Sequence, residues 1–483
     1  MPQATILSSA PSQTRSTPRR WPRRALALPV AAVALAGAVA VSSRRFTPAA
    51  VGPAASISIT SMPGGVAVLI DGKTVGTTPA NLTIVAGQHQ VTLRRPDLMA
   101  VSSALHVTAG QTLQLDTSLW DRTATITDIR PPFPGSTISK ATFLADGRLA
   151  LDITLPPGND HQLWLRKRDG GMERIGPADA AGPMVVTPDG QTVAYLMPMA
   201  PASPAQAGTV GGQRLTTVWT VGADGHGATL RHVLPPSARS TQLTDLAWAP
   251  DGAHLLLVGA RQDSSTGARN ELLWRDPIQG TARTLLNLPT TIVPGSYLWS
   301  PEGDRLALLT RAGALQSLCL VGVQDQSFRY LADLQPTGST PLLFPPLAWS
   351  PDSHRAVYAA GVPSTPTTLG GWLLGDHSAS GLFTTEVAGA TSRRLGTILA
   401  DAPVWRADGS VLALVHANGS VTRSVAAVDV TSGLATPVGT LPLSSGSPAA
   451  VRWDAVHAQA LIAQPQNGNV TYTLATFGSE AAR

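Results

Sequence analysis

The sequence feature that most constrains the fold is a hairpin that recurs along the chain. Residues 243–258 read LTDLAWAPDGAHLLLV, and related stretches read GSYLWSPEGDRLALL and PPLAWSPDSHRAVY. Pro sets the backbone for the first corner of a turn, Asp suits the second and Gly closes it, while alternating apolar residues on each side indicate half-buried strands. The turn acid recurs at intervals of 43 to 62 residues, the period of a four-stranded propeller blade, at Asp146, Asp189, Asp251, Glu302, Asp352, Asp408 and, in degenerate form, Asp454.

Two further strand-like runs follow each hairpin, so each repeat predicts a sheet of four strands, A to D. Tryptophan recurs near the end of strand A and again on strand C, and core packing is the default interpretation of both positions. The last repeat supplies only three strands, and we expect Ala124–Ile129 to close the ring by pairing with the strand around Val470–Leu474. The strand A tryptophans are Trp248, Trp299, Trp349, Trp405 and Trp453, and those of strand C are Trp164, Trp219 and Trp274.

These W-S-P-D-G hairpins, followed by L-W-x-x-D strands, resemble the TolB-type, WD-like propeller repeats. The resemblance covers about residues 121–483 and implies an all-β propeller of seven blades, with six as the alternative. Propellers of this kind serve as binding platforms, periplasmic adaptors and enzyme-associated gates, so the resemblance defines the fold better than the function.

The amino-terminal segment carries most of the positive charge. The formal net charge is +5, but residues 1–45 hold seven Arg and no acid, which leaves 28 basic against 30 acidic residues in the remainder. We therefore expect no nucleic-acid partner. The uncharged run at residues 25–41, with five Arg before it and two after, predicts one transmembrane anchor, with residues 1–24 as a basic cytoplasmic tail and the rest of the chain outside. Cleavage as a signal peptide near Ala38-Val39-Ala40 is the alternative, in which the chain is exported.

Residues 55–118 form a second pattern, separated from the anchor by a Pro- and Ala-rich linker at residues 42–54. Asp71-Gly72 between VAVLI and KTVG is a hairpin signal, and the whole segment predicts a small β-sandwich. The segment resembles the PEGA domain in Pro63-Gly64, Gly76-Thr77-Thr78-Pro79 and Gly87 with His89. Gly65 and Arg95-Pro96-Asp97 depart from the family pattern, and His89 is interpreted as a packing residue.

The motifs of common enzyme classes are absent from the sequence. No G-x-S-x-G elbow, P-loop, Rossmann fingerprint, C-x-x-C or H-E-x-x-H occurs, and the paired carboxylates lie where turn chemistry explains them. The single cysteine, Cys319, lies in an apolar run and is expected to be buried. The prediction is therefore a protein that is not an enzyme, with no catalytic residues, no metal and no cofactor.

Three functions remain open. The first is a membrane-anchored, extracytoplasmic binding or scaffold protein of the bacterial cell envelope, whose propeller displays a loop face to an envelope protein, a peptide or a glycan. The second is a structural envelope spacer with the PEGA-like domain as the contact module, and the third is an enzyme acting at the propeller channel. Polar residues converging on the channel mouth would favour the first and third functions, and a featureless face would favour the second.

Insertions between strands B and C define the expected binding face. They read MPMAPASPAQAGTVGGQR, ARQDSSTGARN and AGVPSTPTTLGGWLLGDHSASG in the second, third and fifth blades, and they are either tolerated surface loops or a binding surface. Trp372 is a propeller tryptophan outside both repeat positions, and it either anchors its loop or forms a hot spot for a partner. The candidate partner-binding residues are Trp372, Leu373, Leu374, Arg261, Asp263 and Arg269.

Overall fold

The structure, a computed structural model, describes residues 54–478 with short gaps. All described elements are strands, and within the described residues no helix is long and apolar enough to cross a membrane. The expected anchor at residues 25–41 lies outside the described residues. The undescribed residues are 1–53, 158–159, 181, 199–208, 211–212, 215, 234–240, 264–266, 276–281, 289, 314, 335–341, 361–380, 390, 396–399, 407–408, 416–421, 443–449, 467–468 and 479–483.

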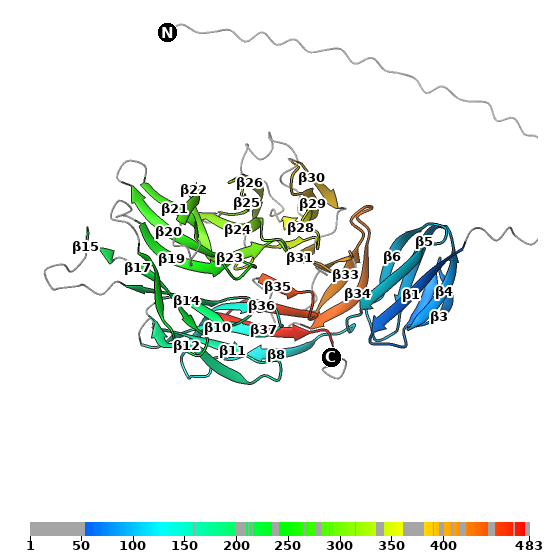
Figure 1. Ribbon diagram of the computed structural model, residues 1–483, viewed down its shortest axis with the longest axis horizontal. Helices are drawn as coiled ribbons and strands as arrows, with labels where there is room; N and C mark the ends of the chain where they lie inside the picture. Colours follow the sequence, from blue (N-terminus) through cyan, green and yellow to red (C-terminus); the bar gives the residue numbers. More distant parts are fainter. Residues whose placement is uncertain are drawn as a thin grey trace, which may run out of the picture. The chain divides into compact units, whose positions relative to one another are not determined.

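The first module is a sandwich of two sheets, drawn in blue in Figure 1. One sheet has the order β4-β1-β7 and the other β3-β2-β5-β6. Apolar side chains on alternating positions of both sheets, among them Ile57, Ile59 and Val68, form its buried core. The strands are β1 (Ala54–Met62), β2 (Ala67–Ile70), β3 (Lys73–Thr77), β4 (Ala80–Val85), β5 (Gly87–Arg94), β6 (Val101–Val107) and β7 (Thr112–Ser118).

The hairpin predicted at Asp71-Gly72 joins β2 to β3. Both residues have positive φ, 50° and 79°, as a tight hairpin turn requires. His89 on β5 holds this turn, because its Nδ1 lies 2.7 Å from Asp71 Oδ2 and its Nε2 lies 2.7 Å from Val85 O. The departure at Arg95-Pro96-Asp97 is accommodated locally, since Arg95 pairs with Asp97 at 2.8 Å and donates to Gly64 O at 3.1 Å.

The second module consists of seven four-stranded antiparallel sheets, and every sheet contacts the next, including the last and the first. This closed ring is a β-propeller, and seven is the number of repeats counted in the sequence. Blades one to four comprise β9 (Thr137–Phe143), β10 (Leu149–Leu155), β11 (Asp160–Arg166) and β12 (Met172–Ala180); β13 (Met184–Val186), β14 (Thr192–Pro198), β17 (Thr216–Gly222) and β18 (Thr229–Val233); β19 (Thr241–Trp248), β20 (Leu255–Asp263), β21 (Gly267–Arg275) and β22 (Ala282–Leu288); and β23 (Thr291–Trp299), β24 (Arg305–Ala312), β25 (Leu315–Gly322) and β26 (Phe328–Leu334).

The remaining three blades complete the ring. A two-stranded hairpin, β15 (Thr209–Val210) with β16 (Gln213–Arg214), lies in the insertion of the second blade. Blades five to seven comprise β27 (Leu347–Trp349), β28 (Arg355–Ala360), β29 (Gly381–Glu386) and β30 (Ser392–Leu395); β31 (Ala400–Trp405), β32 (Val411–Val415), β33 (Thr422–Val428) and β34 (Ala435–Pro442); and β35 (Ala450–Asp454), β36 (Gln459–Gln466), β37 (Asn469–Thr476) and β8 (Thr125–Ile129).

Ring closure occurs as the sequence predicts. The segment β8, drawn in cyan beside the red strand β37 in Figure 1, is the fourth strand of the last blade. It pairs antiparallel with β37 from Thr125 opposite Thr476 to Ile129 opposite Tyr472, slightly further along than expected. The last blade therefore has no open edge at β37, and strands from both sides of the propeller sequence hold the ring together.

The carboxylates of the turn acids accept hydrogen bonds from backbone N–H groups two residues further along the chain. Oδ1 of Asp146 accepts the N–H of Arg148 at 3.0 Å, and Oδ1 of Asp251 accepts that of Ala253 at 2.8 Å. The degenerate copy does the same, since Oδ1 of Asp454 accepts the N–H of Val456 at 3.1 Å. These are Asx-type turns, and they give the recurring acid a structural role.

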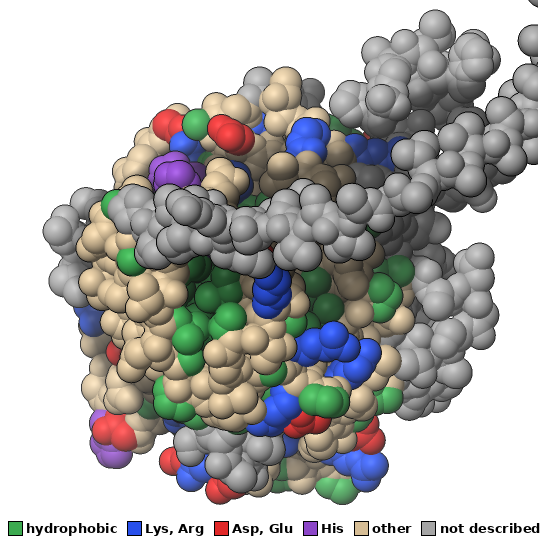
Figure 2. Space-filling model, turned by 90° about the vertical axis from the view of Figure 1, so that its right-hand side faces the viewer, with side chains coloured by type: hydrophobic (Ala, Val, Ile, Leu, Met, Phe, Trp, Pro, Cys, Tyr) green, Lys and Arg blue, Asp and Glu red, His purple; other side chains and the backbone are tan. Residues whose placement is uncertain are grey.

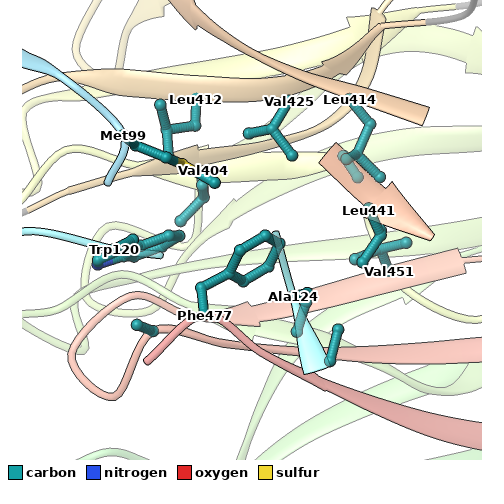
Figure 3. Packing of buried hydrophobic residues seen from close by; sticks show 14 of the residues in the cluster. Met99, Trp120, Ala124, Val404, Leu412, Leu414, Val425, Leu441, Val451 and Phe477 are labelled. Atoms are coloured by element: carbon teal, nitrogen blue, oxygen red, sulfur yellow. The ribbon is translucent and has the colours of Figure 1, made fainter. Parts of the chain in front are cut away.

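The two modules share a buried apolar cluster, which we call the junction. Met99 of the sandwich and Trp120 of the connecting segment pack with propeller residues such as Leu412, Val451 and Phe477 (Figure 3). Trp120 stacks on Trp453 and on Phe477, with ring centroids 5.9 Å apart in both pairs. Close packing of this kind makes the junction a continuation of the core rather than a flexible linker.

Candidate functional site

The first strands of all seven blades converge on the central channel. A cavity of about 950 Å³ lies elsewhere, along the ring-closing strand β8. At the channel itself, residues from β9, β13, β19, β23 and β35 line a cavity of about 510 Å³. A second cavity of about 180 Å³ is lined by residues from β23, β27, β31 and β35. The larger of the two channel cavities, that of about 510 Å³, also includes Pro188, Pro250 and Val456 from turns between strands A and B. It therefore opens on that face of the propeller. We call this opening the channel mouth.

The five strand A tryptophans form the walls of the channel mouth. Trp248 lines the larger cavity, Trp349 and Trp405 line the smaller one, and Trp299 and Trp453 line both. The packing interpretation of these residues is partly correct, because Trp248, Trp349 and Trp405 are buried. Trp349 Nε1 donates to Leu298 O at 3.2 Å and Trp453 Nε1 donates to Ala402 O at 2.8 Å, so these indoles also join neighbouring blades.

A buried ion pair connects the first strands of three blades beneath these walls. Lys140 Nζ on β9 lies 3.1 Å from Asp245 Oδ1 on β19 and 2.9 Å from Leu246 O. The other carboxylate oxygen accepts the hydroxyl of Tyr297 at 2.9 Å and the N–H of Gly295 at 2.7 Å, both on β23. Burial, together with the Asp245 charge, raises the pKa of Tyr297 well above its ordinary value. Both oxygens of the Asp245 carboxylate have hydrogen-bond partners. Lys140, Asp245 and Tyr297 therefore form a polar link across the channel, which we call the strut.

Irregular strand pairing positions these polar residues. The register between neighbouring strands shifts at Leu243/Asp245 in β19 and at Ile292/Tyr297 in β23. Gly295, within the second irregularity, has φ of 72°. Bulges of this kind re-aim side chains out of the regular alternation, which brings a carboxylate and a phenol to one point.

Arg452 on β35 lies at the centre of the site and lines both cavities. Its Nη2 donates to Tyr297 O at 3.0 Å and to Gly295 O at 3.3 Å, and its Nη1 donates to Thr142 Oγ1 at 3.3 Å. The guanidinium lies over the Phe344 ring, 4.5 Å from its centroid. Burial lowers the pKa of Arg452 to about 10, so the group remains charged at neutral pH. Among the described residues, no carboxylate pairs with it.

A second acid on the cavity wall is paired within its own blade. Asp152 on β10 is buried, and its Oδ1 lies 2.9 Å from His161 Nδ1 on β11. Burial raises the pKa of Asp152, and the hydrogen bond to His161 opposes this effect. For His161 burial acts to lower the pKa, but the hydrogen bond to Asp152 and its charge raise it overall.

The sequence did not single out these channel residues. Asp245 in LTDLAW and Lys140 in TISKATF each interrupt an apolar strand, and that interruption is the signal that could have identified them. Arg452, in AVRWD, also interrupts an apolar strand, directly before the repeat tryptophan Trp453. The opposite signs of Lys140 and Asp245 become meaningful only when their strands are known to meet.

The described part of the structure does not test the six residues proposed from the sequence as a binding site. Trp372, Leu373 and Leu374 lie outside the described residues. Arg261 and Asp263 are in β20 and Arg269 is in β21, with Arg261 opposite Arg269 in the backbone register. Most of this third-blade insertion, expected as a loop, therefore extends the B–C hairpin, because strand pairing satisfies its backbone groups better than a loop does.

Among the described residues no group of three or more His, Cys, Asp or Glu side chains could hold a metal ion. Cys319 is buried in β25, and burial raises the pKa of its thiol to about 11. On the face shown in Figure 2, Lys and Arg side chains lie among Asp and Glu side chains rather than forming a continuous basic surface.

Comparisons with known proteins define the class of each module. Residues 54–122 match the model of the PEGA domain, so the sandwich is a PEGA domain. It is followed by a β-propeller whose structural neighbours include TolB. No curated protein matches the chain.

Three solved structures illustrate the propeller likeness. The propeller domain of the trilobed protease from Pyrococcus furiosus is 12% identical with a TM-score of 0.40, over 71% of this chain and 96% of that one. TolB from Acinetobacter baumannii is 13% identical with a TM-score of 0.30, over 68% and 80%. Kuenenia stuttgartiensis hydrazine synthase is 15% identical with a TM-score of 0.41, over 72% and 97%.

These structures correct one prediction. We predicted from the sequence that the chain is not an enzyme, but similar propeller chains occur in a protease and in a hydrazine synthase. The prediction is therefore wrong, because the absence of common enzyme motifs does not separate enzymes from binding modules on this fold. At these identities the likeness concerns the fold alone, and no activity follows from it.

Proposed function

We propose that this chain is a membrane-anchored, extracytoplasmic binding protein of the cell envelope that receives a ligand at the propeller channel mouth. The observation that carries the proposal is the cavity of about 510 Å³ with indole walls and charged groups at its base. Ligand sites typically combine this size, apolar walls and a few placed polar groups. Polar residues converging on the channel mouth support binding over a purely structural spacer.

The partner classes remain an envelope protein, a peptide or a glycan. Tryptophan walls suit all three, because an indole buries a large apolar area at little entropic cost. The anchor at residues 25–41, with residues 46–483 outside the cytoplasm, belongs to the same proposal and rests on the arginine asymmetry.

Site-specific photo-cross-linking in intact cells tests the proposed face. Val456, which is 80% exposed at the channel mouth, can carry the photoreactive residue without disturbing packing. Leu434, 68% exposed on a turn between β33 and β34 that does not line either channel cavity, is the matched control. We expect a discrete cross-linked product at 456 and none at 434. Equal labelling at both positions would contradict a channel-mouth site.

A cross-linker at position 372 tests the alternative face defined by the B–C insertions. If that loop is the contact, Trp372→Ala should weaken partner capture and leave the melting temperature nearly unchanged. A large loss of stability without a binding defect would instead identify Trp372 as a loop anchor.

Topology is tested separately with a reporter fused after residue 483. A reporter active only outside the cytoplasm should be active in this fusion. Activity of a cytoplasm-specific reporter instead would contradict export of the propeller.

A further inference from the structure

Charge pairing at the channel mouth is incomplete. The charged residues that line the two cavities are Lys140, Asp152, Arg452 and Asp454. Three of these have a partner of opposite or titratable charge: Lys140 has Asp245 at 3.1 Å, Asp152 has His161 at 2.9 Å and Asp454 has His457 at 2.7 Å. Arg452 is the exception among the described residues, because its recorded hydrogen bonds reach only backbone carbonyls and a threonine hydroxyl.

The desolvation of the Arg452 guanidinium without a carboxylate partner is unfavourable in free energy. Removing a cation from water without a counter-ion is unfavourable, and carbonyl oxygens and an aromatic face compensate only part of that loss. Arg452 also faces the cavities rather than being sealed by packing, since it lines both of them. The counter-charge that it lacks can therefore be supplied by a ligand.

We propose that Arg452 binds the carboxylate of a ligand that carries an apolar or aromatic group next to that carboxylate. A guanidinium matches the two oxygens of a carboxylate in geometry as well as in charge. A single uncompensated positive charge suits a monoanion better than a dianionic phosphate. Trp299 and Trp453, which line the cavities beside Arg452, provide the surface for the apolar group.

This inference rests on the proposed binding function and adds the chemical class of the ligand. The shared chemistry is a carboxylate beside an apolar group, which a small aromatic acid and the carboxyl end of a peptide both present. The probes are therefore N-acetylphenylalanine and the peptide acid N-acetyl-Ala-Ala-Phe, each compared with its neutral carboxamide.

Titration calorimetry on the full-length protein, supported by tryptophan fluorescence, measures binding of the four probes. We expect saturable binding of at least one acid and at least tenfold weaker binding of its carboxamide. A preference for the peptide acid would identify a peptide end, and equal affinities would identify the small acid as sufficient. No saturable binding of either acid, or equal binding of acid and carboxamide, would overturn the proposal.

Variants assign the effect to Arg452. Arg452→Met should weaken acid binding at least tenfold, and Arg452→Lys should weaken it less because it keeps the charge but loses the planar donor pair. Arg174→Met, at an exposed arginine of β12, is the control and should bind as the parent does. Unchanged acid binding in Arg452→Met would overturn the proposal. If Arg452→Met does not fold, Arg452→Lys and the acid–carboxamide ratio of the parent decide the question.

Failure here is distinguishable from failure of the proposed function. Equal binding of acid and carboxamide would remove the carboxylate assignment, whereas a specific cross-link at position 456 would still support a channel-mouth partner.

Discussion

Two arginines in this protein lie over aromatic rings away from the outer surface, a buried one at the junction and a half-buried one in the channel. Arg406 is 3% exposed, lies 5.3 Å from the centroid of the Trp120 ring and donates to Ser118 O at 3.1 Å. Arg452 lies 4.5 Å from the Phe344 centroid but lines two cavities. The first is enclosed by apolar packing between two modules, and the second remains open to a ligand. The same contact between a guanidinium and a ring therefore serves cohesion in one region and, on our proposal, recognition in the other.

The difference teaches that a guanidinium packed over a ring does not by itself identify a functional residue. Arg452 differs from Arg406 because cavities adjoin its charged group. A charged group that is enclosed by packing has no room for a ligand beside it. The following experiments test whether the junction carries stability and the channel carries binding, beginning with the largest expected effect.

Deleting residues 121–130 should have the largest effect on both regions. The deletion removes β8, so β37 keeps only β36 as a partner strand and the ring is no longer closed by the amino-terminal strand. We expect the thermal midpoint to fall by roughly 10 °C or more, or the cooperative transition to disappear, in a calorimetric scan. Deletion of residues 479–483, which follow the paired part of β37, is the control. A near-parental midpoint for the first deletion would show that ring closure contributes little.

Trp120→Ala tests the junction directly. The indole is 2% exposed and stacks on both Trp453 and Phe477, so its removal leaves a large cavity. We expect a loss of about 3–5 kcal/mol in the free energy of unfolding, measured by denaturant titration. A loss below about 1 kcal/mol would mean that the modules do not depend on this cluster.

Arg406→Met and Arg452→Met sharpen the comparison between the two arginines. Arg406→Met should cost about 1–3 kcal/mol, because it removes a buried charged donor from the hydrogen bond to Ser118 O. Arg452→Met should cost less, since no carboxylate in the described part of the chain loses its partner and the uncompensated charge is removed. Chemical denaturation of the two variants side by side measures the difference. The reverse order would place the structural role at Arg452.

Tyr297→Phe removes one hydrogen bond from the strut in the channel. Asp245 keeps Lys140 and the N–H of Gly295, so we expect a loss of about 1–2 kcal/mol in unfolding free energy. The phenyl ring retains the packing volume, which isolates the hydroxyl. Full parental stability would indicate that the Asp245 carboxylate does not need this donor.

The smallest effect is expected from Asp325→Asn on the outer part of blade four. The hydrogen bond from Arg305 is the main cause that lowers the pKa of Asp325 to about 2 from the ordinary 3.8. A carboxylate with a lowered pKa stabilises the fold above its unfolded value and loses that contribution as the pH falls from about 4 to about 2. Because the Asp325 side chain is half exposed, we expect no more than about 0.5–1 kcal/mol at neutral pH. Unfolding curves at pH 7 and pH 3 measure it, and a difference from the parent that grows as the pH falls would contradict the assignment.

Local sequence rules were sufficient for the repeating parts of the fold. A turn acid bonds two residues ahead, as Asp251 does to Ala253, so the hairpins are visible in any short window. The paired Asp71-Gly72 turn follows for the same reason. The ring-closing pair could be predicted because a three-stranded last repeat needs one more strand. How far the strands continue into the third-blade insertion could not be predicted, because it depends on pairing between β20 and β21 rather than on composition.

By itself, then, the sequence determined the module order, the hairpins, the blade repeat and the ring closure, because each depends on local backbone chemistry or on a repeat count. The tertiary structure alone decided the candidate site. Lys140 and Asp245 are 105 positions apart, and Arg452 and Gly295 are 157 positions apart. Only the closed ring brings these strands to one channel, and only bulges that interrupt the alternation aim their polar groups at one another. The missing carboxylate partner of Arg452 among the described residues is likewise a property of the assembled cavity, because no sequence window shows which acids of this part of the chain the fold places elsewhere.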